Sequence, residues 1–211
     1  MPAPLIIDLD GVLRRWEPLD AVEAHHGLPR GALPAVAFEP ELLDRVVTGR
    51  IDDDAWRAEV TTALATVHGP AARAAVAEWS ASAGAVDPAV LEVVRRYRRT
   101  APVVALTNAT SRLPRDLARI GLDRELDRVF SSHELGVAKP DPRVFALVCA
   151  QLGREPAECL FVDDTEGHVA AARRTGLRAH HYRDPAGLAV FLGFDREASW
   201  LHDDRRPESP S

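Results

Sequence analysis

The sequence has almost no lysine: of its 26 basic residues, Lys139 is the single lysine and the others are arginines. The two residue types are not interchangeable, because a compact ammonium fits where a broad, planar guanidinium does not. A drift in composition would leave one lysine by chance, whereas a charged pocket would retain it for its size. The rest of the sequence has to decide between these explanations.

Basic residues are fewer than acidic ones: the chain has 26 Lys and Arg and 32 Asp and Glu, which gives a formal net charge of −6. Without a long basic stripe, nucleic acid is not an expected partner. The two cysteines, Cys149 and Cys159, lack CxxC or Cys/His spacing, so we expect buried thiols rather than a zinc site or a disulfide. Aromatic residues make up 6% of the chain, and the abundance of Ala, Val and Leu is typical of a helix-rich α/β protein.

Long apolar runs are absent, and none approaches the roughly 20 residues of a membrane-spanning helix. The first residues, MPAPLIIDLDG, have no basic start and reach Asp8 too soon for a signal sequence. We therefore expect a cytoplasmic protein without a membrane partner, either a monomer or a homodimer. The last residues, 203–211, are polar and rich in proline, and we expect a frayed tail there.

Short apolar runs alternate with helical patterns over most of the 211 residues. This alternation predicts an α/β fold with a Rossmann-like, doubly wound parallel sheet. The expected strands are 4–10, 102–108, 128–132, 159–164 and 178–182. The clearest expected helices are 88–99, 111–120, 142–152 and 167–175.

One interval breaks this alternation, because from Leu13 to about Ala85 no convincing strand is present, only helical stretches. We interpret residues 14–85 as a helical insert into an α/β core formed by residues 1–13 and 86–202. The acidic run 52–54 is expected to cap a helix rather than to hold a metal.

Polar residues collect where the expected strands end, the edge at which open α/β sheets bind ligands. In chain order they are Asp8 and Asp10, Thr107 and Asn108, Lys139, and Asp163 and Asp164. Each group alone is typical of a turn or a helix cap. Together at one edge, the carboxylates would repel each other and raise each other's pKa values unless cations join them.

An all-oxygen donor set suits Mg²⁺, which normally also binds a phosphate oxygen. A phosphate needs further positive charge, and Lys139 can supply it as a small point charge that reaches a carboxylate and the phosphate together. This gives a hypothesis for the single lysine: an arginine could not sit between Asp163 and a phosphate without displacing the metal.

These motifs, in this order and strand context, resemble the four motifs of the haloacid dehalogenase-like hydrolase superfamily over about residues 4–190. The helical insert resembles the cap domain of its first subclass. The resemblance implies a Mg²⁺-dependent phosphatase that acts on a small phosphorylated metabolite. Asp8 would attack phosphorus and form an aspartyl phosphate. Asp10 would protonate the leaving oxygen and then deprotonate the attacking water.

The resemblance also implies roles for the remaining motif residues. Mg²⁺ would be held by Asp8, the Asp10 backbone carbonyl and the Asp163-Asp164 pair, with Asp164 the direct ligand and Asp163 the partner of Lys139 or of a metal-bound water. The Thr107 hydroxyl, Lys139 and backbone N–H groups near Leu9 and Asn108 would bind the phosphate.

Two residues depart from the family's pattern. Val12 stands where many members have Thr, and it matters little because its backbone would face the site. His168 stands where an Asn or Asp often supports a metal-bound water; it either orients such a water or is an ordinary histidine near a helix start.

Other polar residues allow functional and structural interpretations. Arg14, Arg15 and Trp16 could contact a substrate, or be solvated arginines and a packing Trp. The pairs 25–26 and 180–181 are adjacent histidines without a spacing partner for a metal site, and we expect both to be structural.

The motif residues also bear on the alternatives to a phosphatase. Dehalogenases of the superfamily lack the second aspartate, so Asp10 favours phosphate chemistry. A phosphosugar mutase stays open, because it uses the same groups. The intact motif set disfavours a non-enzymatic binding or regulatory protein, and the helical insert and the order of Lys139 before Asp163 disfavour a phosphoacceptor signalling domain. Neither GxGxxG nor GxxxxGK[ST] is present to indicate a nucleotide cofactor.

Overall fold

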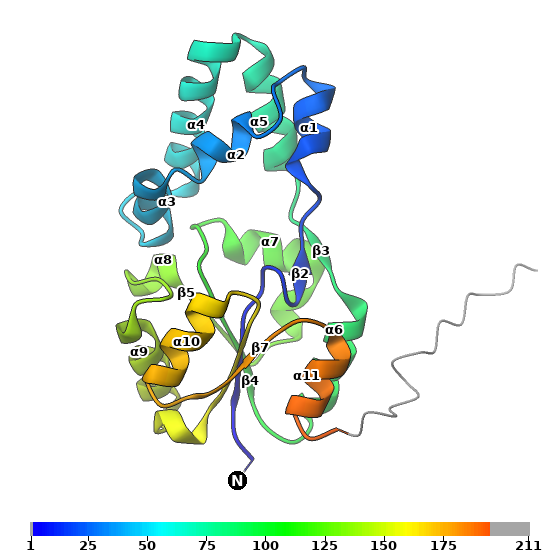
Figure 1. Cartoon of the computed structure of the whole chain (residues 1–211), viewed down its shortest axis with the longest axis vertical. Helices are drawn as coiled ribbons and strands as arrows, with labels where there is room; N and C mark the ends of the chain where they lie inside the picture. Colours follow the sequence, from blue (N-terminus) through cyan, green and yellow to red (C-terminus); the bar gives the residue numbers. More distant parts are fainter. Residues whose placement is uncertain (1, 195–211) are drawn as a thin grey trace, which may run out of the picture.

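The computed structural model describes residues 2–194. It has two parts, a parallel sheet covered by helices and a separate group of helices above the carboxyl edge of that sheet (Figure 1). The expected tail, 203–211, and the expected end of the core, 195–202, lie outside the described residues. Among the residues described, no helix is long and apolar enough to cross a membrane.

The sheet is five-stranded and wholly parallel, with the order β5-β4-β1-β6-β7. Its strands are β1 (Leu5–Ile7), β4 (Val103–Thr107), β5 (Arg128–Ser131), β6 (Leu160–Asp163) and β7 (Arg178–His181). Each lies inside a strand expected from the sequence, and the doubly wound α/β fold is confirmed. Because β1 lies at the centre, between β4 and β6, the residues that follow these three strands meet at one edge.

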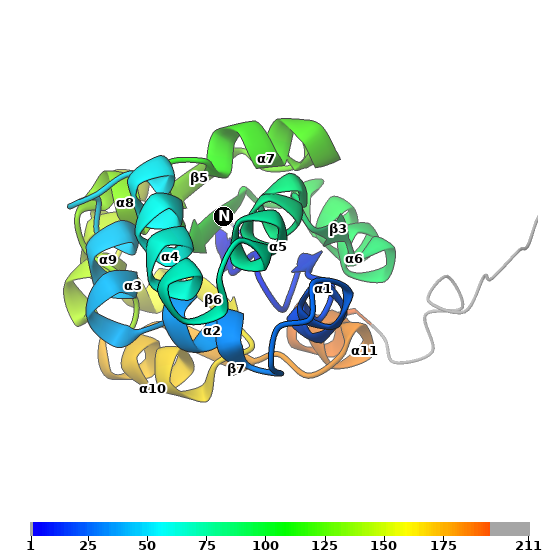
Figure 2. The ribbon, with the colours of Figure 1, turned by 90° about the horizontal axis from the view of Figure 1, so that it is seen from above.

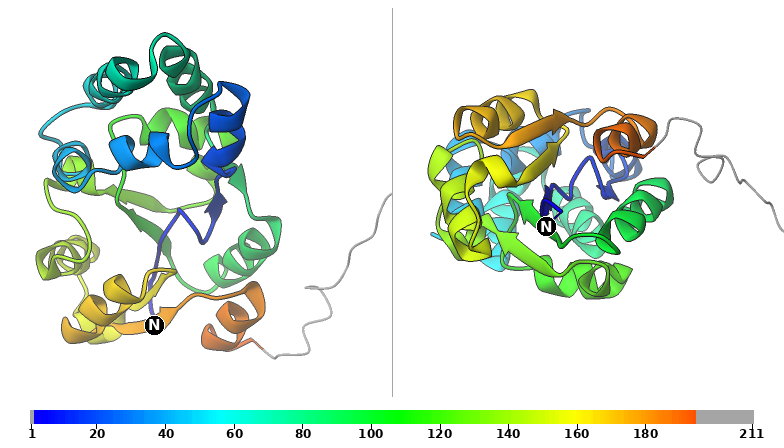
Figure 3. Two further views of the ribbon diagram at one scale, coloured as in Figure 1. Left: turned by 45° about the horizontal axis from the view of Figure 1, so that its top comes forward. Right: turned by 90° about the horizontal axis from the view of Figure 1, so that it is seen from below.

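Side chains of the sheet alternate between two buried clusters, and this alternation separates the helices into two layers. Leu5 and Ile7 face the cluster that α6, α7 and α11 cover, whereas Ile6 faces the cluster that α9 and α10 cover. Figure 3 shows helices on both sides of the sheet. The helices of this part are α6 (Pro88–Arg98), α7 (Leu113–Ile120), α8 (Ser132–Leu135), α9 (Pro142–Leu152), α10 (Glu166–Arg174) and α11 (Pro185–Phe191), with short 3-10 turns at Leu122–Arg124 and Pro156–Glu158.

Three of these helices begin with the same dipeptide, Asp-Pro. The side chain of Asp87 accepts hydrogen bonds from the N–H groups of α6, and Asp141 and Asp184 do the same for α9 and α11. Proline is favourable at the first helical position because its missing N–H would be unpaired there in any case. The local sequence therefore sets where these helices start.

The second group of helices has a hydrophobic core of its own, which includes Leu33, Val60, Leu64 and the edge-to-face pair Trp56 and Trp79. Viewed from above, its helices lie over the edge of the sheet (Figure 2). They are α1 (Leu19–His25), α2 (Ala32–Ala37), α3 (Pro40–Val47), α4 (Asp53–His68) and α5 (Ala71–Ala81). We call these helices the cap; the boundaries 14–85 stay a prediction.

Two short strands join the cap to the rest, and the sequence did not indicate them. β2 (Arg14–Arg15) pairs antiparallel with β3 (Ala85–Val86). The expectation of no strand from Leu13 to about Ala85 is therefore wrong at its ends. Two residues are too few to show an alternating pattern, so periodicity could not reveal this ribbon.

Candidate active site

Asp8 follows β1 directly and is buried at the centre of the sheet's carboxyl edge. Its backbone N–H donates to the Val162 carbonyl at 2.9 Å, which holds it beside β6. The backbone N–H of Leu9 donates to Asp8 Oδ1 at 2.7 Å. One carboxylate oxygen is thereby fixed by the turn that follows the strand.

Lys139 lies between two carboxylates from different strands. Its Nζ is 2.9 Å from Asp8 Oδ2 and 2.6 Å from Asp163 Oδ2, and the Lys139 side chain has 0% exposure. One ammonium thus faces two buried carboxylates. The structure brings these three predicted residues together, although 24 positions separate Lys139 from Asp163 in the chain.

The pKa values of the three groups follow from burial and from this pairing. Burial raises the pKa of Asp8 to about 8, although the Lys139 ammonium opposes the change. Burial also opposes ionisation of Asp163, but hydrogen bonds from His168 and Lys139 and the Lys139 charge outweigh it and lower its pKa to about 2. For Lys139 the two carboxylates outweigh burial and raise its pKa. Asp8 therefore needs further positive charge before it is fully ionised near neutral pH.

Thr107 and Asn108, at the end of β4, occupy the edge beside β1. The Asn108 side chain donates from Nδ2 to the Lys139 carbonyl at 2.8 Å and accepts the Lys139 N–H at Oδ1 at 2.9 Å. The nitrogen and the oxygen of its side-chain amide both position the loop that carries Lys139. The backbone N–H of Asn108 and the buried Thr107 hydroxyl stay the predicted phosphate contacts.

Asp164 lies against the turn after β1, where Gly11 has a φ of 81°. A Cβ atom on Gly11 would lie 2.0 Å from Asp164 Oδ2, so a side chain cannot occupy this position without displacing the carboxylate. The left-handed backbone therefore favours glycine at this position of the DxDG motif, and a side chain there would also displace the exposed Asp164 carboxylate.

His168, in the first turn of α10, contacts the side chain of Asp163. Its Nδ1 is 3.1 Å from both carboxylate oxygens of Asp163. This contact supports the interpretation that His168 orients a group of the site. Asp8, Asp163 and His168 also form one of two clusters of potential metal-ligating side chains among residues 2–194.

Asp10 has partners that the sequence did not assign to it. Arg14 binds both carboxylate oxygens, from Nε to Oδ1 at 2.6 Å and from Nη2 to Oδ2 at 2.9 Å. The indole N–H of Trp16 donates to Oδ1 at 2.7 Å, and the Arg14 guanidinium lies 4.6 Å from the Trp16 ring centroid. Arg14 is buried, so it is not a solvated arginine. A charged residue four positions after Asp10 was the signal available in the sequence.

The cap contacts this edge of the core through the start of α4. Asp53 is buried, and its Oδ1 accepts a hydrogen bond from Thr110 Oγ1 at 2.7 Å, while its backbone N–H donates to Ser111 Oγ at 2.9 Å. Asp52 accepts the N–H of Ala55 and so caps α4, as the sequence predicted. In this acidic run, Asp52 therefore caps α4 and Asp53 joins the cap to the core.

A cavity of about 430 Å³ lies between α3 of the cap and the loop that carries Lys139. Four of its charged lining residues pair with each other, since Arg50 binds Asp44 and Arg143 binds Asp141, whereas the fifth, Lys139, binds Asp8 and Asp163 outside the lining. These pairs of opposite charge give the lining no strong preference for one sign of charge.

The donor chemistry of this edge fits a magnesium ion. Asp8, Asp163 and Asp164 supply carboxylate oxygens, and the buried pair Asp8 and Asp163 shares one ammonium between them. A dication would offset the remaining negative charge and favour the ionised form of Asp8. Hard oxygen ligands are those that Mg²⁺ prefers.

Comparisons with known proteins agree with this arrangement. A family model described as haloacid dehalogenase-like hydrolase matches residues 5–176. A fructose-1-phosphate phosphatase of Escherichia coli is 27% identical over 84% of this chain and 94% of its own length. Phosphoglycolate phosphatase 1 of Pseudomonas aeruginosa is 28% identical over 84% of this chain and 68% of its own length.

A solved structure shares the fold. It is a HAD family enzyme from Bacteroides thetaiotaomicron in complex with magnesium and inorganic phosphate, with 19% identity and a TM-score of 0.68 over 87% of this chain and 95% of that chain. At this identity the likeness supports the fold alone.

Proposed function

Since the chain belongs to the haloacid dehalogenase-like hydrolases, we propose that it is a magnesium-dependent phosphatase that hydrolyses a small organic phosphomonoester through a phosphorylated Asp8. The observation that carries the proposal is the buried Asp8–Lys139–Asp163 contact, with Asp10 two residues from Asp8. The curated relatives, which act on fructose 1-phosphate and phosphoglycolate by name, support a small phosphorylated substrate. A cytoplasmic location stays a prediction from the sequence.

Asp8 is the nucleophile in this proposal. Its Oδ1 is held by the Leu9 N–H and its Oδ2 by Lys139, so the carboxylate has a fixed orientation towards an incoming phosphoryl group. Attack by one of these oxygens on phosphorus breaks the bond to the leaving alkoxide and transfers the phosphoryl group to Asp8. Water then attacks the same phosphorus and releases phosphate and the free carboxylate.

Asp10 moves the protons in both steps. It gives a proton to the leaving oxygen and takes one from the attacking water. Lys139 and the backbone N–H groups at the strand ends stabilise the charge on the phosphoryl oxygens. Asp8, the Asp10 carbonyl and Asp164 would hold Mg²⁺, which supplies positive charge to the phosphoryl oxygens. Asp163 keeps Lys139 charged and in place.

The first experiment measures hydrolysis of a generic aryl phosphate with Mg²⁺ and with EDTA. We expect turnover by the wild type with Mg²⁺, none with EDTA, and none by Asp8→Asn in either condition. Asp54→Asn is the matched control, because Asp54 is an exposed carboxylate of the cap outside the site. Turnover by Asp8→Asn at the wild-type rate would contradict the proposal.

The covalent step has its own readout. Protein quenched in acid during turnover should gain the mass of one phosphoryl group, and Asp8→Asn should not. Phosphate release is then compared for sugar phosphates, phosphoglycolate and nucleoside monophosphates. Conversion of one sugar phosphate into an isomer without phosphate release would favour the mutase instead.

A further inference from the structure

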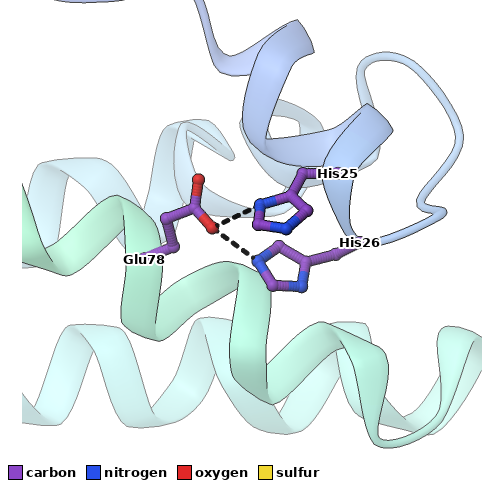
Figure 4. Close-up of side chains that lie close together, drawn as sticks. All are labelled: His25, His26 and Glu78. Carbon is purple, nitrogen blue, oxygen red and sulfur yellow. Dashed lines mark hydrogen bonds and ion pairs between the residues drawn. The ribbon is translucent and has the colours of Figure 1, made fainter.

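Two adjacent histidines of the cap share one carboxylate oxygen from a distant helix. His25 ends α1, His26 follows it, and Glu78 lies in α5. His25 Nδ1 and His26 Nε2 are each 2.8 Å from Glu78 Oε2 (Figure 4). The sequence offered no spacing partner for this histidine pair, because 52 positions separate His26 from Glu78.

This donor set differs from that of the catalytic edge. Two imidazole nitrogens and one carboxylate oxygen suit Zn²⁺ and other late divalent transition metals, whereas Mg²⁺ prefers oxygen ligands. The three ligand atoms lie within 4.8 Å of one another. Ligands about 2.0–2.1 Å from a tetrahedral Zn²⁺ lie roughly 3.3 Å apart, so small side-chain rotations bring the three groups to that spacing.

The exposure of the cluster is compatible with an ion that keeps water ligands. The side chains of His25 and Glu78 are 70% and 43% exposed, and that of His26 is 17% exposed. A metal has free access from solvent, and water completes its coordination. The less exposed His26 gives the cluster one fixed ligand.

We propose that His25, His26 and Glu78 form a second metal site, for a divalent transition metal of the Zn²⁺ class, that joins α1 to α5. In this site His25 binds through Nδ1 and His26 through Nε2, and the proton on each coordinating nitrogen moves to the other nitrogen of its ring. Because α1 follows β2 and α5 precedes β3, the ion links the segments by which the chain enters and leaves the cap. The site would stabilise the cap without taking part in phosphoryl transfer.

The test uses full-length protein without a purification tag, and Co²⁺ as a spectroscopic probe in the presence of excess Mg²⁺. Titration of the wild type should give visible d–d absorption that saturates at one equivalent. Glu78→Gln and His26→Ala should bind Co²⁺ at least about 10-fold more weakly, because removal of a ligand costs no less than the 10–100-fold typical of an outer-shell partner. Zn²⁺ should raise the Tm of the wild type and leave that of Glu78→Gln unchanged.

Two controls separate this site from others that could take the probe. His68→Ala removes another histidine of the cap and should bind Co²⁺ like the wild type. Asp8→Asn alters the catalytic edge and should also keep the binding. Loss of binding in Asp8→Asn, equal binding in Glu78→Gln, or an intense thiolate charge-transfer band would each overturn the proposal.

A measurement on the unmodified chain covers the case in which a variant folds poorly. Zn²⁺ should shift the imidazole nitrogen resonances of His25 and His26 in long-range ¹H–¹⁵N spectra. Unshifted resonances at one equivalent of Zn²⁺ would also overturn the proposal.

Discussion

Arg14 binds both carboxylate oxygens of Asp10, at 2.6 and 2.9 Å. This two-point contact fixes the direction of the carboxylate, because the guanidinium presents two parallel N–H groups in a rigid plane. Arg14 also belongs to β2, which pairs with β3 where the chain leaves the cap. The orientation of the proposed acid and base is therefore set by the linker between cap and core.

Arg14→Lys should lower kcat by about 10-fold or more, since an ammonium binds one oxygen at a time and misplaced catalytic groups lose much of their effect. KM for an aryl phosphate should change less, because Arg14 holds Asp10 and the phosphate contacts lie elsewhere. Steady-state kinetics with saturating Mg²⁺ measures both values.

Arg15→Lys is the matched control on the same strand. Arg15 pairs with Asp87 rather than with Asp10, and its side chain is 66% exposed. It should keep kcat within about 2-fold, as surface substitutions usually have small effects. Equal losses in the two variants would show that the linker, and not the contact with Asp10, sets the rate.

Lys139→Arg should abolish most turnover even though it keeps the charge. The lysine side chain has 0% exposure and contacts two carboxylates, so the larger guanidinium has no room there. Overpacking of a buried position costs about 1–3 kcal/mol, which should lower the free energy of unfolding without preventing folding. Kinetics and urea unfolding measure the two effects.

Lys139→Met provides the comparison, because it keeps the length of the side chain and removes the charge. Removal of one partner from a buried ion pair costs about 3–5 kcal/mol, so this variant should be the less stable of the two. Normal turnover by Lys139→Arg would refute the explanation of the single lysine by size.

The strands, and the position of the polar motif residues at one edge of the sheet, could be predicted from the sequence because both depend on a local pattern of residues. An apolar run that ends in Asp8 or Asp163 indicates a strand and the edge at which it stops. Asp-Pro pairs also precede α6 and α9, which lie within helices that were predicted on apolar pattern. The same pair at Asp184 and Pro185 precedes α11, which was not among the expected helices.

What the sequence did not reveal depends on contacts between distant segments or on side-chain direction. The contact of Glu78 with two histidines forms only when α1 and α5 pack together. Arg14 is close to Asp10 in the chain, but a position in sequence does not say whether its side chain turns to solvent or to the site. Both require tertiary packing, which no periodicity encodes.

Thr110→Val tests the contact between cap and core. It keeps the shape of the side chain but leaves Asp53 Oδ1 without its 2.7 Å hydrogen bond. A buried acceptor without a partner costs about 1–3 kcal/mol, so the free energy of unfolding should fall by that amount. Hydrogen exchange at the first turn of α4 should become faster, because this turn docks on the core there.

Ser80→Ala is the control for this prediction. Ser80 accepts a hydrogen bond from Arg57 within the cap, and Arg57 binds Asp53 through the other carboxylate oxygen, Oδ2, so this variant leaves the contact of Oδ1 with Thr110 in place. It should lower stability without faster exchange at the start of α4. The docking argument fails if both variants change that exchange equally.

Gly11→Ala tests the close contact between Gly11, in the turn after β1, and Asp164, which follows β6. The added Cβ would lie 2.0 Å from Asp164 Oδ2, so the carboxylate has to move away from the turn. If Asp164 is a direct ligand of Mg²⁺, the Mg²⁺ concentration for half-maximal turnover should rise by about 10-fold or more, by analogy with the 10–100-fold losses that displaced metal-site partners cause. A magnesium titration of aryl phosphate hydrolysis measures this shift.

Gly121→Ala separates this effect from backbone strain. Gly121 has a similar φ of 76°, and a Cβ there would meet nothing within 4 Å. A left-handed non-glycine residue costs roughly 1–2 kcal/mol, so both variants should lose stability by a comparable amount. Only Gly11→Ala should weaken the response to Mg²⁺, because only there does the new methyl group compete with a carboxylate for the same space. An unchanged magnesium requirement in Gly11→Ala would remove Asp164 from the proposed ligands and leave Asp8 and the Asp10 carbonyl as the groups that hold the ion.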